Sequence, residues 1–197
     1  MKGRQAEPGG ARPAAALMWF FSGIPVHLQD MVFTEGYSIE NDLYIDSNIE
    51  RILDSEERKN HSVMIAEVCR WFAYEVDKYK KGLDYRSDPV LSRLVPVTGY
   101  TCCPNYLRDL GFCEPPADLL AEIARNYGLA LRGRLLYEII VRFTHAPKRG
   151  SRKYSYAALK ELSSVYGAKG RLVTRIIDDI RLKLGIGGSE GQFVLNV

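Results

Sequence analysis

The chain has 197 residues, of which 46% are hydrophobic and 26% are charged, ordinary values for a globular protein with a buried core. No run of about 18 apolar residues occurs, which excludes a transmembrane helix, and no signal-peptide cleavage site follows Ala14–Phe21, so we expect a cytoplasmic protein. Residues 1–128 carry 14 basic and 19 acidic side chains, whereas residues 129–197 carry 13 and 5. This basic C-terminal part indicates either contact with a polyanion or a solvated basic surface.

Residues 1–16 are rich in Gly, Pro, Ala and Arg, a composition that predicts a disordered tail. Leu17–Val26 is apolar enough to dock on a core. Met31–Phe33 then reads as a short strand, followed by a turn at Gly36, where we expect a positive φ. Ser38 is expected to cap a helix because its hydroxyl can bond a free amide of the first turn.

The rest of the chain shows helical periodicity. A helix over 48–53 is expected to begin at Asp46 or Ser47, and the polar residues 55–60 are expected to end it. Apolar side chains at three- and four-residue steps predict further helices at 62–81, 105–110, 116–127, 131–144, 155–167 and 171–184. Residues 192–197 read as a terminal strand. In the last helix, the side chains expected to form a buried stripe are Val173, Ile176, Ile177, Ile180 and Leu184.

Two groups of side chains could carry chemistry. The first is an acidic cluster of Glu35, Glu40, Asp42 and Asp46, because carboxylates at the end of a strand can hold Mg²⁺ together with a substrate phosphate. Glu40 and Asp42 diverge on a helix, so Glu40, nearest the strand end, is the predicted metal ligand. The cysteines and histidines lack the spacing of a zinc site or of a nucleophilic centre.

The second group is basic and lies in the C-terminal half. A loop at 147–153 supplies Lys148, Arg149, Arg152 and Lys153, and the last helix carries Arg171 and Arg175 one turn apart. Such an arrangement can track a phosphate backbone, so these residues are predicted to contact nucleic acid.

The segment Phe33-Thr34-Glu35-Gly36-Tyr37-Ser38-Ile39-Glu40-Asn41-Asp42-Leu43 resembles the "T-x-x-Y-S-I-E-N-Y-L" motif of a TOPRIM-like family of unknown function. Leu131-Arg132-Gly133-Arg134-Leu135-Leu136 is similar to the family's "x-x-G-K-x-L-L" helix start, and the resemblance spans roughly residues 20–180. Members accompany AAA/ABC-type ATPases of the overcoming-lysogenisation-defect (OLD) kind in anti-phage defence and include the toxin half of the PARIS system.

The resemblance implies a TOPRIM α/β core followed by helices, and Mg²⁺-dependent cleavage of nucleic acid, with RNA targets for some members. It assigns Glu40 to the metal and Arg134, in place of the family's Lys, to a phosphate contact in the catalytic site. Arg132 beside it is expected to contact nucleic acid. The family's early Glu and Asp-x-Asp motifs are missing from this sequence, so the resemblance implies a truncated or degenerate member that is inactive alone.

We therefore expect an α/β fold tending to mostly α. A remnant of a TOPRIM-like core would occupy residues 17–60, and a helical domain with a basic C-terminal half would occupy 61–197. Two alternatives stay open. One is a nucleic-acid-binding module whose residues 155–197 form a winged-helix-like unit with a recognition helix over 173–185. The other is a regulatory subunit that docks on an ATPase partner through its helical face.

Overall fold

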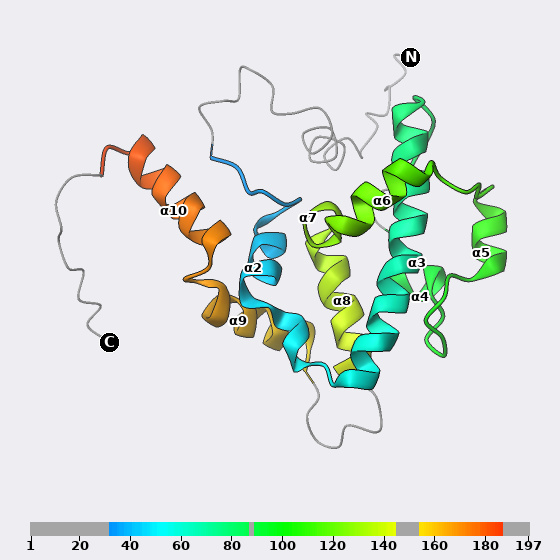
Figure 1. Ribbon diagram of the computed structural model, residues 1–197, viewed down its shortest axis with the longest axis horizontal. Helices are drawn as coiled ribbons and strands as arrows, with labels where there is room; N and C mark the ends of the chain where they lie inside the picture. The colour runs from blue at the N-terminus through cyan, green and yellow to red at the C-terminus, as the bar shows by residue number, and fades with distance from the viewer. Residues whose placement is uncertain (1–31, 87–88, 145–153, 187–197) are drawn as a thin grey trace, which may run out of the picture.

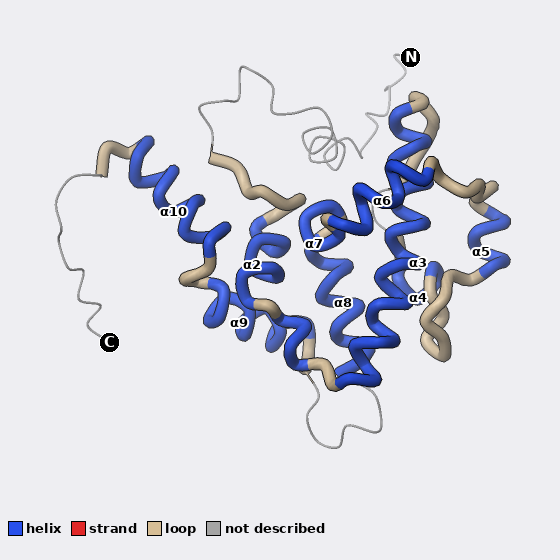
Figure 2. Tube along the Cα trace, viewed as in Figure 1, coloured by secondary structure: helices blue, strands red, loops and turns tan. Residues whose placement is uncertain are grey.

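The computed structural model describes residues 32–86, 89–144 and 154–186, and within these ranges the protein is helical, with no β-strand (Figure 2). The expected helical part is therefore confirmed. The expected strand is wrong for Val32 and Phe33, which are irregular, since the described residues offer no second strand to pair with them. The predicted tail at 1–16, the apolar segment at 17–26, the basic loop at 147–153 and the strand at 192–197 lie outside the described residues.

The described helices follow one another along the whole chain (Figure 1). In order they are α2 (Ile39–Ser47), the 3-10 helix η2 (Ile49–Ile52), α3 (Ser55–Lys80), α4 (Leu91–Leu94), α5 (Pro104–Asp109), α6 (Ala117–Arg125), α7 (Tyr127–Ala130), α8 (Gly133–Thr144), α9 (Tyr156–Gly167) and α10 (Arg171–Lys183). None of these helices is long and apolar enough to cross a membrane.

The long helix α3 forms one side of the core. It starts earlier than predicted, because Asp54 and Glu57 make a capping box in which each side chain accepts the other's backbone N–H, at 2.8 and 2.9 Å. Residues 55–60 therefore open this helix rather than end the previous one. The predicted end is confirmed, since Gly82 follows it with a φ of 68°.

The hydrophobic core lies between α3, α6 and α8. The apolar faces predicted for these helices are buried, and the largest fully buried side chains include Met64, Trp71, Phe72, Ile123, Leu136, Tyr137, Ile139 and Ile140. At about 25 cal/mol per Å² of apolar area, this cluster is the main favourable term in folding.

Helix α2 lies at the centre of the other half of the molecule, between α7, α8, α9 and α10 (Figure 1). Its neighbours approach closely because they present glycine: a Cβ on Gly133 would lie 2.6 Å from Glu40 Cβ. The positive φ expected for Gly36 is wrong, because among the described residues only Asn48, Gly82, Gly111 and Gly185 have one. The glycines packed directly against α2 or its side chains are Gly36, Gly128, Gly133, Gly167 and Gly170.

Helix α10 extends away from the core (Figure 1). Its predicted bounds are confirmed to within one residue, but its predicted buried stripe is wrong. Only Leu172 is buried in this helix, whereas Ile177, Ile180 and Leu184 are 39%, 43% and 66% exposed. The helix packs on the rest of the protein through its first turns, on a side adjacent to the stripe.

Candidate nucleic-acid interface

Helix α2 is fixed in place by the side chain of Asn41, which is fully buried. Its Nδ2 donates to the carbonyl oxygens of Gly128 and Leu131, both at 2.6 Å. Its Oδ1 accepts from the backbone N–H and the hydroxyl of Ser38, both at 3.0 Å. Ser38 is the N-cap of α2, as predicted. One amide side chain thus joins the start of α2 to the segment that leads into α8.

The four carboxylates of the acidic cluster have four different sets of partners. Glu35 forms ion pairs with Arg171 and Arg175 of α10, at 3.6 and 3.4 Å. Asp46 Oδ2 accepts the backbone N–H of Val173 at 2.8 Å and so caps the N-terminus of α10 from another helix. These two side chains attach α10 to the segment around α2.

Asp42 is fully buried and accepts backbone N–H groups from Gly36 and Glu35, at 2.9 and 3.2 Å. Burial raises the pKa of its carboxyl above the ordinary value, although these two amides lower it. Asp42 therefore shapes the loop before α2 rather than facing a site.

Glu40 is the predicted metal ligand, and its Oε1 is already shared by two groups of α9. Lys160 Nζ lies 2.6 Å away and Tyr156 Oη donates to it at 3.0 Å. Within residues 32–86, 89–144 and 154–186, no three His, Cys, Asp or Glu side chains are grouped so as to hold a metal ion. Mg²⁺ usually binds one or two carboxylates together with phosphate oxygens, so the assignment of Glu40 as its ligand stays a prediction.

Arg134 lies in the first turn of α8, with its side chain 62% exposed and its Nε donating to Glu138 at 2.8 Å. It lines two hollows. One, of about 360 Å³, lies against Pro89–Ser92 at the start of α4, and the other, of about 450 Å³, lies against Val141 and Tyr156. We call the two hollows together the Arg134 groove.

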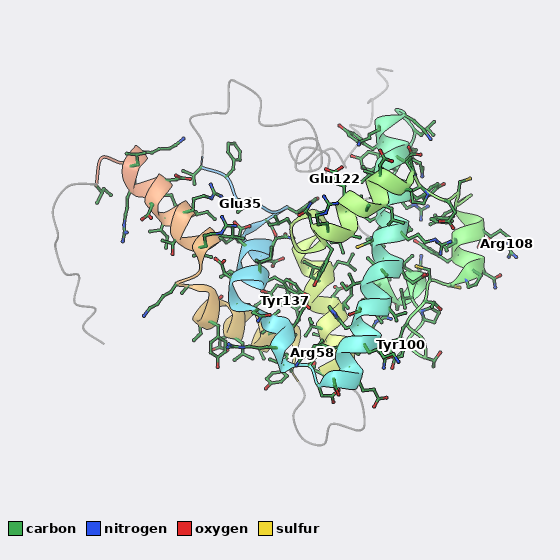
Figure 3. All side chains as sticks on the ribbon, viewed as in Figure 1. Glu35, Arg58, Tyr100, Arg108, Glu122 and Tyr137 are labelled. Carbon is green, nitrogen blue, oxygen red and sulfur yellow. The ribbon has the colours of Figure 1, made fainter. Side chains whose placement is uncertain are left out.

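Glu40 and Arg134, which come from the two segments that carry the resemblance, meet at Tyr156. This ring packs edge-on against the ring of buried Tyr137 of α8, with centroids 5.8 Å apart, and Tyr137 also contacts Tyr44 of α2 (Figure 3). Burial, the hydrogen bond to Glu40 and the charge of Glu40 raise the pKa of Tyr156 from 10.0 to about 12, while the charge of Arg134 opposes the rise.

The raised pKa of Tyr156 predicts a loss of stability in strong alkali. The folded state holds this proton more tightly than the unfolded state, so the stabilisation is complete below pH 10 and is lost as the pH rises from 10 to about 12. Urea unfolding at several pH values should show a decline in this window that is smaller in Tyr156→Phe. An unchanged pH dependence in that variant would contradict the assignment.

The other residues predicted to contact nucleic acid lie in separate parts of the chain. Arg132 is half-buried just before α8. Arg171 and Arg175 lie on α10 against Glu35, and Arg175 also pairs with Asp179 and donates to the carbonyl of Phe33. Their charges are thus partly neutralised within the protein. Lys148, Arg149, Arg152 and Lys153 lie outside the described residues, in the connection from α8 to α9.

Sequence reasoning missed Tyr156 and Lys160 as members of this site. They lie one turn apart on the predicted helix 155–167, so their shared face could have been found. Their partner Glu40 is remote in the sequence, and no local pattern indicates that contact.

Comparison with protein-family models, with curated proteins and with solved structures gives no significant match. The TOPRIM-like resemblance therefore stays a prediction drawn from the two sequence segments.

Proposed function

We propose that this chain is the mostly helical part of a TOPRIM-like protein of anti-phage defence and that it contacts nucleic acid through the Arg134 groove. The observation that carries the proposal is the meeting of Glu40 and Arg134 around Tyr156. Glu40 and Arg134 belong to the two segments that resemble the family motifs, and both lie beside Tyr156 of α9. The groove beside them is open to a ligand.

The charge of the groove favours a polyanion. Arg134 and Arg142 of α8 line the groove, Arg132 lies just before α8, and Lys160 lies on α9. These four basic side chains stand against two carboxylates, Glu138 and Glu40. Arg142 is also an anchor, because it donates to the carbonyl of Val95 at 2.7 Å. Arg134, more exposed and at the helix start, is the residue best placed to bind a phosphate.

Cleavage by this chain alone is not part of the proposal. Glu40 supplies one carboxylate, and the early Glu and Asp-x-Asp motifs of the family are missing from the sequence. We infer that any Mg²⁺-dependent cleavage would need carboxylates from elsewhere, together with an AAA/ABC-type ATPase partner. The residues described here would hold and position the nucleic acid.

The test measures, by fluorescence anisotropy, the binding of the full chain to labelled single-stranded RNA and to labelled duplex DNA. Arg134→Ala should weaken binding about tenfold, equivalent to ~1.4 kcal/mol. It should also reduce the slope of log binding constant against log salt concentration by the amount expected for about one phosphate contact. Titrations between about 50 and 200 mM salt give that slope.

Arg108→Ala is the matched control, since Arg108 is an exposed arginine on α5 that lines neither hollow of the groove (Figure 3). Equal weakening by both substitutions, or binding indifferent to salt, would exclude the groove as the interface. The winged-helix alternative makes a different prediction, namely that Arg171→Ala and Arg175→Ala weaken binding most. Ion pairing does not separate the two interfaces, because Arg134 is paired with Glu138 as Arg171 and Arg175 are paired with Glu35, so the binding measurements decide between them.

A further inference from the structure

The apolar side of α10 is half-buried in the first turns of the helix and exposed in the later ones. We call Val173, Ile176, Ile177, Ile180 and Leu184 the α10 stripe. Val173 and Ile176 are half-buried, and the exposed fraction then rises along the helix to 66% at Leu184. The same spacing of apolar residues in α8 is buried in the core.

An exposed stripe of this kind needs a cover. A helix of 13 residues is marginal in water on its own, and its stability usually comes from packing of its apolar face. α10 is capped by Asp46 and inserts Leu172, but these contacts use its first turn. The later turns present branched aliphatic side chains to solvent, which marks an interaction surface.

The chain that precedes Val32 starts directly beside this surface. Arg175 Nη2 donates to the carbonyl of Phe33 at 2.9 Å, and Glu35 pairs with Arg171 and Arg175. Residues 33–35 are thus held along the first two turns of α10. Five residues separate Val26 from Val32, and an extended chain advances about 3.3–3.6 Å per residue. Residues 17–26 can therefore reach every part of a helix about 20 Å long.

The composition of the preceding segment matches the stripe. Residues 13–29 contain no Asp, Glu, Lys or Arg, and they include Met18, Trp19, Phe20, Phe21 and Ile24. A second copy of the chain is a weaker candidate. One helix, about 20 Å long and 10–12 Å wide, presents far less than the roughly 800 Å² that each partner buries in a stable interface.

We propose that Leu17–Val26 packs on the α10 stripe and completes the fold around α10. The apolar side chains of the segment would leave water together with Ile177, Ile180 and Leu184. The proposal is independent of the phosphate-contacting role of the Arg134 groove, so either can fail without the other.

Trp19 reports on the contact. The chain has two tryptophans, and the other, Trp71, is fully buried in the core. A Trp19→Phe variant gives the signal of Trp71, and subtraction gives that of Trp19. In the full chain, we expect Trp19 to be protected from acrylamide. In the double variant Ile177→Asp/Ile180→Asp, it should become as accessible as free tryptophan amide, and its emission should move to longer wavelength.

Leu182→Asp is the matched control, because Leu182 is 76% exposed and lies on the opposite side of α10 from the stripe. It should leave Trp19 protected. Full accessibility of Trp19 in the parent chain would overturn the proposal. Protection that appears only at high protein concentration would also overturn it, since the cover would then be a second copy.

A converse experiment does not depend on the folding of substituted α10. Phe20→Asp/Phe21→Asp leaves α10 intact, and hydrogen exchange of peptides covering residues 171–184 should become faster, while peptides of α3 keep their rates. Unchanged exchange in α10 would overturn the proposal.

Discussion

Asn41→Ala is expected to lower the free energy of unfolding by about 3–5 kcal/mol. The substitution leaves the buried carbonyls of Gly128 and Leu131 and the polar groups of Ser38 without their partner. Each unsatisfied buried group costs about 1–3 kcal/mol, and Ser38, which is only partly buried, recovers some of this from water. Since a domain of this size has a total stability of about 5–15 kcal/mol, the loss would be a large part of it.

Urea denaturation followed by circular dichroism measures this change. Asn105→Ala, at an exposed asparagine in α5, is the control and should stay within about 0.5 kcal/mol of the parent. Asn41→Asp sharpens the test, because it keeps an acceptor for Ser38 but cannot donate to the two carbonyls when ionised. If Asn41→Ala were as mild as the control, Asn41 would not be what fixes α2.

Gly170→Ala should cost about 2–3 kcal/mol, although the backbone at Gly170 is extended and suits any residue. The added Cβ would overlap the carboxylate of Asp46, which caps α10. Either the cap breaks or the whole helix moves outward, and both outcomes loosen α10 from α2. Hydrogen exchange in residues 171–184 would report the loosening directly.

A double-mutant cycle separates the clash from the loss of the cap. Asp46→Gly alone should cost about 2 kcal/mol, from the loss of the N-cap and from a glycine inside α2. In Asp46→Gly/Gly170→Ala, both the carboxylate and the Cβ of Asp46, which would lie 2.2 Å from the added Cβ, are gone, so the double variant should lose less stability than the sum of the two single losses. Gly99→Ala is the control, because a Cβ there meets nothing within 4 Å. Simple additivity would show that Asp46 is not what Gly170 accommodates.

The helices that bury an apolar face could be predicted from the sequence, and the start of α9 shows why. Ser155 caps it, as predicted, with its hydroxyl accepting the N–H of Ala158 at 3.1 Å, and the following periodicity fixes the helix. The start of α3 was missed, although Asp54 and Glu57 have the spacing of a capping box. The polar stretch was assigned by composition rather than by that pairing.

The position of α2 could not be predicted, because polar side chains make its central contacts. Asn41 and Asp42 are fully buried, and both are side chains that local patterns place outside. Their burial depends on backbone groups supplied by distant parts of the chain. The prediction that the apolar stripe of α10 is buried was wrong because periodicity identifies an apolar face but does not say whether the described chain covers it.

In the candidate site, too, single residues could be proposed from the sequence but most of their partners could not. Arg134 was predicted from its motif, and in the structure it lines a hollow beside Tyr156, which donates to Glu40. The partners of Glu35, Glu40 and Asp46 were not found, since each comes from α9 or α10. Glu40 alone was predicted to bind a metal ion, and in the structure each of the four carboxylates of the cluster serves a separate contact.

The central place of α2 sets the order in which this chain can fold. Its hydrogen bonds to α7, to Leu131 just before α8, and to α9 and α10 join residues that are 87 to 127 positions apart. Such distant contacts form late, because long loops must close before they give any stabilisation. During synthesis α2 leaves the ribosome long before these neighbours exist. Asn41 and Asp42, which are fully buried in the folded protein, therefore stay hydrated until the last helices of the chain assemble around them.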